Sequence, residues 1–197
     1  MHSRLYTHSI NNQMKTTMFD KDTFKVTAKD IALIGVMVAV IEVCKVVMMG
    51  IPNVELTTFW MIMFALYFGM KVVYVVPVFI LVEGLLFGFG LWWVMFLYVW
   101  PLLAVLTILM KKMDSALGWS ILAGLFGLLY GAFCSLPYFF IGLVDGGILG
   151  GVRSAFAWWI AGIPFDLIHG GSNFVIMLLL YKPVRAVMEK TKGLIEG

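Results

Sequence analysis

Residues 154–180 read SAFAWWIAGIPFDLIHGGSNFVIMLLL, an apolar stretch that contains one acid, one histidine and one asparagine. A helix needs about 20 apolar residues to cross the hydrocarbon core of a bilayer, so this stretch is long enough to span a membrane. Asp166, His169 and Asn173 recur at helical spacing, which places their side chains on one face. The stretch therefore predicts a transmembrane helix with one polar stripe.

The composition of the whole chain supports the same class of protein. Hydrophobic residues make up 62% of the sequence and charged residues 13%, whereas a soluble domain has about 25% charged residues. The sequence also lacks the alternating segments of about 10 residues that indicate a membrane barrel. The expected fold is an all-α integral membrane protein with six transmembrane helices. The expected spans are residues 28–49, 54–69, 72–87, 91–110, 116–143 and 155–181.

Basic residues gather on one side of these spans. Of the 14 lysines and arginines, only Lys45 and Arg153 fall on or near the other side. Because loops rich in Lys and Arg stay in the cytoplasm, both termini are expected there. Residues 1–27 are then a cytoplasmic leader without signal-peptide features, residues 28–185 the membrane domain, and residues 186–197 a cytoplasmic tail. The two cysteines form no CxxC or Cys/His cluster, so neither a disulfide nor a metal site is expected.

Several ionisable residues fall inside the expected spans, where such residues are usually paired, turned inward or functional. Glu42 and Lys45 are three residues apart and can neutralise each other on one helix face, either as a structural pair or as part of a site. Glu83 either faces a site or reaches interfacial water. The polar stripe of residues 166, 169 and 173 is interpreted as ligand-facing; a pH-sensing histidine and an interhelical hydrogen-bond lock are the alternatives.

Three further residues of the 154–180 stretch shape this interpretation. Pro164 removes a helical hydrogen bond and predicts a kink. Gly170 and Gly171 allow another backbone or a ligand to come close. We expect Gly170 to make room for the ligand.

Aromatic residues and missing motifs narrow the function. An interfacial aromatic belt is the default explanation for Trp92, Trp93, Tyr98, Trp100, Trp158 and Trp159. An aromatic cavity at the outer face is the alternative, and the sequence does not separate the two. The sequence has no HExxH, GxSxG or P-loop motif and no basic nucleic-acid patch. An intramembrane enzyme is therefore a poor interpretation, and any ATP must be used by another chain.

Small residues recur on one face of the first expected span, a pattern that allows close helix contacts in membranes. The chain, over about residues 28–185, resembles the substrate-binding (S) component of energy-coupling factor transporters. The resemblance rests on this spacing, on the six spans and on the stretches IPNVELTTFWMIMFALYFG (51–69), LLFGFGLWWVMFLYVWP (85–101) and AFAWWIAGIPFDLIHGGSNF (155–174). In that family the small-residue motif contacts the coupling subunit. The matching residues are Ala28, Ala32, Gly35 and Ala39.

The resemblance implies a multi-pass protein of the bacterial cell membrane that binds a water-soluble vitamin at its outer side. It would associate with a transmembrane coupling subunit and two ATPase subunits, bind no cofactor itself, and contact lipid but no nucleic acid. In the family the outer loops cover the ligand; here they are residues 49–55, 88–93 and 144–154. The expected ligand contacts are Asn53, Glu55, Glu83, Trp92, Trp93, Arg153, Trp159, Asp166, His169 and Asn173.

The identity of the vitamin depends on the aromatic, glycine-rich outer face. This face suits a large amphipathic ligand with few formal charges, and cobalamin or another corrinoid is the leading expectation; pantothenate, a pyridoxine-type vitamin and a queuosine precursor stay open. The main alternative to the whole interpretation is a stand-alone proton-coupled secondary transporter or channel. In that case Asp166, His169 and Glu83 would relay protons.

Overall fold

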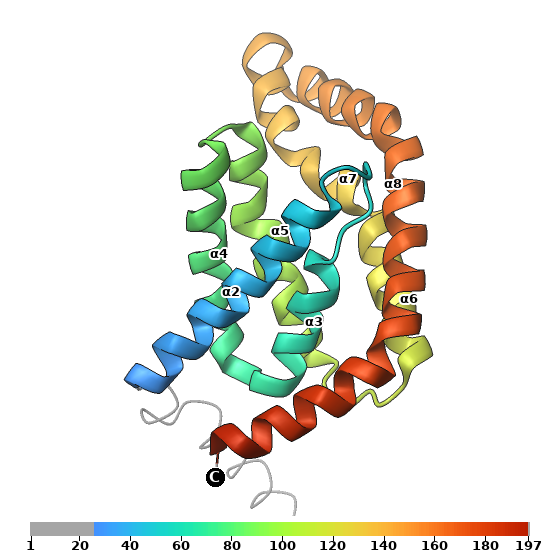
Figure 1. Ribbon diagram of the computed structural model, residues 1–197. Coiled ribbons are helices and arrows are strands. Elements are labelled where there is room, and N and C mark those ends of the chain that lie inside the picture. Colours follow the sequence, from blue (N-terminus) through green and yellow to red (C-terminus); the bar gives the residue numbers. More distant parts are fainter. Residues whose placement is uncertain (1–25, 197) are drawn as a thin grey trace, which may run out of the picture. The chain divides into compact units, whose positions relative to one another are not determined.

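The computed structural model describes residues 26–196, and in this range every regular element is a helix (Figure 1). The helix bounds are α2 Ala28–Met48, α3 Thr57–Phe68, the 3-10 helix η2 Gly69–Lys71, α4 Val72–Phe87, α5 Leu91–Leu109, α6 Ala116–Leu128, α7 Tyr130–Cys134 and α8 Leu136–Glu196.

Four mainly helical stretches in the described chain are long and apolar enough to cross a membrane. They are Ala28–Met48, Thr57–Phe87, Leu91–Leu109 and Tyr130–Thr191. The all-helical class is confirmed, and the apolar helices are compatible with a membrane protein. The number of six spans and the side on which the termini lie stay predictions. One reason is that Thr57–Phe87 contains two of the expected spans, joined through η2.

The contacts within the chain divide it into two units, Met1–Leu33 and Ile34–Gly197. In the first unit the described residues begin α2 with a reciprocal cap. The Thr27 N–H donates to Asp30 Oδ2 over 3.0 Å, and the Asp30 N–H donates to Thr27 Oγ1 over 3.2 Å. This capping box satisfies two of the free N–H groups at the helix start. Nearly all of the expected leader, residues 1–25, lies outside the described residues.

The fifth expected span, residues 116–143, is not one helix. It comprises α6, the short α7 and the first turns of α8. The interruption at Ser135 has a cause in the sequence, because Pro137 has no N–H to donate to the carbonyl four residues earlier. That carbonyl belongs to Phe133, and it accepts instead from the Tyr98 hydroxyl over 2.9 Å. A side chain of α5 thus replaces the missing helical hydrogen bond.

The glycine-rich stretch 144–154 was expected to separate the last two spans, and the break inside α8 is confined to two of its residues. Gly146 and Gly147 alone have non-helical dihedral angles there, and Gly147 has a φ of 61°. The helical segments on either side then fold back closely, since a Cβ on Gly142 would lie 2.6 Å from the carbonyl oxygen of Gly150. Pro164 introduces no such break, because α8 keeps helical dihedral angles around it.

Glycines also bring α6 against the second half of α8, where the two helices run side by side in Figure 1. A Cβ on Gly127 would lie 2.8 Å from the Cα of Gly170, and a Cβ on Gly170 would lie 2.8 Å from the carbonyl oxygen of Gly124. Gly170 therefore makes room for helix α6, which corrects our expectation that it makes room for a ligand. Residues 186–196, expected as a separate tail, continue α8 as helix.

Candidate functional site

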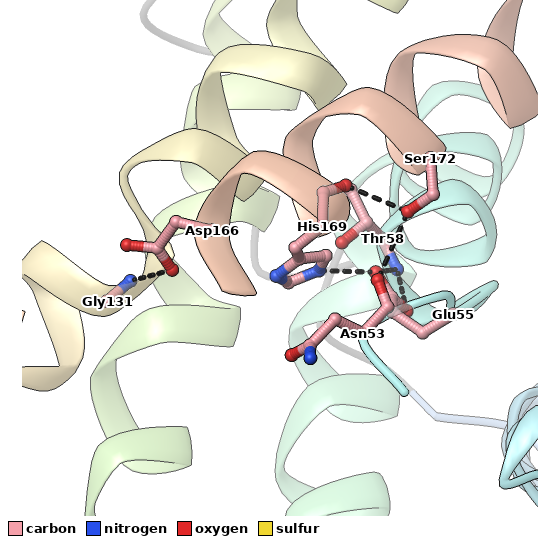
Figure 2. A network of polar contacts seen from close by, with 7 residues as sticks. All are labelled: Asn53, Glu55, Thr58, Gly131, Asp166, His169 and Ser172. Atoms are coloured by element: carbon pink, nitrogen blue, oxygen red, sulfur yellow. Dashed lines mark hydrogen bonds and ion pairs between the residues drawn. The ribbon is translucent and has the colours of Figure 1, made fainter. Parts of the chain in front are cut away.

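A polar contact joins the loop before α3 to the middle of α8. His169 Nε2 lies 3.2 Å from Glu55 Oε1 (Figure 2). The Glu55 carboxylate also accepts from the N–H of Thr58, with distances of 2.9 and 3.2 Å to its two oxygens, and so caps the first turn of α3. Next to it, the Ser172 hydroxyl donates to the carbonyl of Asn53 over 3.2 Å. The 49–56 loop is therefore held against α8 at two points.

The ionisation of Glu55 reflects these contacts. Burial by itself raises the pKa of this carboxyl group, because it disfavours the charged form. The hydrogen bond and the charge of His169, together with the Thr58 N–H, act in the opposite direction and leave the pKa of Glu55 below its usual value of 4.5. The ionised form of Glu55 thus contributes to holding the loop in place.

Asp166 lies one turn before His169 on α8 but points to a different partner (Figure 2). Its Oδ1 accepts from the N–H of Gly131 in α7 over 3.0 Å. A Cβ on Gly131 would lie 2.3 Å from the other oxygen, so only glycine allows this approach. Asp166 is 7% exposed, and its Oδ2 has no hydrogen-bond partner within residues 26–196. One oxygen therefore anchors α7, and the other is buried without a partner among the described residues.

A small cavity of about 170 Å³ lies among these groups. Its polar lining includes Asn53, Glu55, Asp166 and His169, all four of which were expected at the site. The remaining lining residues are Lys45, Thr57, Phe79, Phe96, Trp100 and Tyr130. The cavity thus combines charged groups with aromatic walls.

A larger and more apolar cavity of about 380 Å³ adjoins it, because Phe96, Tyr130 and Asp166 line both. Its other lining residues are Trp92, Met95, Gly131, Cys134, Trp158, Ala161, Gly162 and Phe165. The indole of Trp158 stacks on the ring of Tyr138 with 3.9 Å between the ring centres. The small cavity is therefore the more polar and the larger one the more aromatic, and Asp166 lines both.

Lys45 and the buried Glu83 form a partly buried ion pair between α2 and α4. This corrects the expected pairing of Lys45 with Glu42: Glu42 lies beside the pair, close enough to interact with both. The Lys45 ammonium also lies over the rings of Phe87 and Phe96, 4.9 and 5.5 Å from their centres. Lys45 therefore lines the small cavity with its charge already partnered by a carboxylate.

The structure brings together only part of the expected ligand contacts. Asn53, Glu55, Asp166 and His169 line the small cavity, and Trp92 and Asp166 the larger one. The other expected contacts line neither cavity; they are Glu83, Trp93, Arg153, Trp159 and Asn173. Two of these five side chains have other partners. Glu83 pairs with Lys45, and the indole N–H of Trp93 donates to the carbonyl of Ile80 over 2.7 Å.

Most residues that line the cavities were not expected as ligand contacts, and four aromatic residues illustrate this. Tyr130 packs edge-on against the His169 ring, with 4.9 Å between ring centres. Trp100 is buried, and its indole N–H finds no acceptor in the described chain. Phe96 and Trp158 complete the aromatic walls. A helical wheel centred on Asp166 would have favoured the wrong tryptophan, because at about 100° per residue Trp159 lies about 20° from Asp166 and Trp158 about 80°, whereas Trp158 lines the larger cavity.

Residues 26–196 contain no group of three or more His, Cys, Asp or Glu side chains suited to a metal ion. Both cysteines are free thiols. Comparisons of the chain with family models, curated proteins and solved structures gave no match. Functional inference therefore rests on the sequence features and on the geometry of the two cavities.

Proposed function

We propose that this protein is the substrate-binding component of an energy-coupling factor type importer and that it binds a small water-soluble micronutrient in the paired cavities. The observation that carries the proposal is a partly open polar cavity among apolar helices, lined by residues whose buried polar atoms lack partners. Buried polar groups are normally hydrogen-bonded. The free Oδ2 of Asp166 and the free indole N–H of Trp100 therefore support a ligand that supplies the missing contacts.

The first helix supports the partner proposal. Ala28, Ala32, Gly35 and Ala39 are all exposed. Nothing lies within 4 Å of the position that a Cβ of Gly35 would occupy. Small residues on an exposed helix face allow another helix to approach closely. We assign this face to the transmembrane coupling subunit, which would connect the chain to two ATPase subunits at the cytoplasmic side of a bacterial cell membrane.

The size of the cavities bears on the choice of micronutrient. Pockets for drug-sized ligands measure about 300–1,000 Å³, and the larger cavity, at about 380 Å³, falls near the lower end of this range. This volume favours a single-ring vitamin or precursor. Cobalamin, our expectation from the sequence, would require the walls of the cavities to move apart, and its binding stays a prediction.

The alternative function, a proton-coupled secondary transporter or channel, draws support from the same charged groups. Lys45, Glu83, Glu55, His169 and Asp166 all lie on or beside the small cavity, and intramembrane ionisable groups serve as proton relays in transporters. The pairing of Lys45 with Glu83 and of His169 with Glu55 favours structural roles for four of these five groups.

One experiment separates the two functions. The tagged chain is purified from its native membrane, and its companions are identified by mass spectrometry. We expect a membrane subunit and two ATPases with Walker motifs, and uptake by the reconstituted complex that requires ATP and persists when the proton gradient is collapsed. Uptake by the chain alone in liposomes, driven by a proton gradient without ATP, would reject the proposal in favour of the alternative.

A further inference from the structure

The charged groups around the small cavity are not all paired with an opposite charge. Two carboxyl groups, Glu55 and Asp166, and two basic groups, Lys45 and His169, line it. Each basic group already contacts a carboxylate, because Lys45 pairs with Glu83 and His169 with Glu55. Asp166 is left with a single backbone N–H as its hydrogen-bond partner among the described residues.

Burying such a carboxylate is costly unless it is paired with a positive charge or fully hydrogen-bonded. A metal ion is a poor candidate for this pairing, since no suitable cluster of ligands exists in the described range. An organic cation fits better. It needs only one carboxylate, and the aromatic walls formed by Phe96, Trp100 and Tyr130 attract a positive group through the faces of their rings.

The neighbouring cavity defines the rest of the ligand. Its walls are apolar and aromatic and include Trp92, Trp158 and Phe165. Asp166 is common to both cavities. A ligand whose charged head lies at Asp166 can therefore extend a flat apolar body between these side chains.

We propose that the paired cavities select a small organic cation, an amine or amidine whose N–H groups contact Asp166 Oδ2 and whose ring lies in the larger cavity. This inference rests on the proposed function, because it specifies the ligand class of the same site. A head group that also carries an acceptor atom can accept a hydrogen bond from the Trp100 indole N–H, which has no partner among the described residues.

The test uses three probes of nearly equal shape and different charge: benzamidine, a cation at neutral pH, benzamide, which is neutral, and benzoate, an anion. Each is titrated into the purified full-length chain, and binding is followed by tryptophan fluorescence, since Trp92, Trp100 and Trp158 line the cavities. We expect benzamidine to bind at least about tenfold more tightly than benzamide, with benzoate weakest, because a charge-assisted hydrogen bond is roughly twice as strong as a neutral one.

Asp166→Asn supplies the matched variant, since an amide oxygen can still accept from the Gly131 N–H. It should weaken benzamidine binding by about ten- to a hundredfold and leave benzamide nearly unchanged. Asp145→Asn is the control, because Asp145 is exposed and lines neither cavity. Trp158→Leu should weaken benzamidine and benzamide by a similar factor if the ring occupies the larger cavity.

Equal affinity of the wild-type protein for benzamidine and benzamide, tighter binding of benzoate, or no binding of any probe would overturn the inference. A cation preference that survives in Asp166→Asn would also overturn it. None of these outcomes depends on partner subunits. Failure to recover ATPases with the chain would reject the proposed transporter class while leaving the measured charge preference in place.

Discussion

The adjacent glycines of α8 allow a direct test of how closely α6 and α8 pack. A Cβ on Gly170 would lie 2.4 Å from Leu128 Cγ and 2.8 Å from the carbonyl oxygen of Gly124, whereas a Cβ on Gly171 would meet nothing within 4 Å. Both substitutions to alanine gain the same helix propensity, about 1 kcal/mol. The difference between Gly170→Ala and Gly171→Ala therefore isolates the steric clash.

Adding a methyl group to a well-packed contact costs about 1–3 kcal/mol. The Leu128 side chain can rotate away, but the Gly124 carbonyl belongs to the backbone of α6 and moves only with the helix. We therefore expect Gly170→Ala to be less stable than Gly171→Ala by about 1–3 kcal/mol. For a chain of this size each kcal/mol corresponds to about 2–4 °C in melting temperature.

The assay is thermal unfolding of the two variants and the wild type in the same detergent, followed by tryptophan fluorescence. Gly171→Ala should melt at or above the wild-type temperature, and Gly170→Ala below it. If the two variants melt together, α6 and α8 do not approach as closely as described. Gly170 would then be free to face a ligand, as the sequence first suggested.

Three further predictions concern the partner surface, the loop and the anchor. Gly35→Trp should abolish capture of the coupling subunit while ligand binding survives. The control, Val43→Trp on an exposed part of the same helix, should affect neither. Loss of folding in Gly35→Trp would instead indicate that this face packs within the chain. Because the pKa of Glu55 is lowered, the stabilising effect of the Glu55 carboxylate is present above pH 4.5 and is lost as the pH falls through the lowered pKa. Acid should therefore reduce the melting temperature of the wild type more than that of Glu55→Gln. Asp166→Ala should be less stable than Asp166→Asn by about 1–3 kcal/mol, because it leaves the buried Gly131 N–H without its acceptor. Equal melting temperatures of the two variants would show that the contact does not anchor α7.

The sequence predicted helices best where polar residues and glycines mark their ends. The third expected span coincides with α4, which ends before Gly88 with its positive φ of 92°. The fifth was wrong because apolar composition does not reveal a break inside a hydrophobic run. Pro137 was the available signal, but the acceptor that stabilises the break, the Tyr98 hydroxyl, comes from another helix.

Five of the ten expected ligand contacts line the cavities, but the sequence did not predict which of these residues contact one another. The spacing of Asp166, His169 and Asn173 indicated a common face, and all three are buried. Their partners could not be derived from spacing, because Glu55 lies 114 residues from His169. Lys45 illustrates the same limit: its neighbour along the helix is Glu42, but its ion-pair partner is on α4.

The Lys45–Glu83 pair has a consequence for biosynthesis. The two residues are 38 positions apart, and synthesis at about 5–20 residues per second separates their emergence by about 2–8 s. If α2 spans a membrane, as its length and apolar composition allow, it enters during this interval with its lysine unmatched by α4. Glu42, one turn before Lys45 on the same helix, is the carboxylate nearest to Lys45 along the chain. We expect Glu42 to act as a temporary partner at the translocon, and its replacement by glutamine, which removes the charge but keeps a polar side chain, to slow integration of the nascent chain more than it destabilises the finished fold.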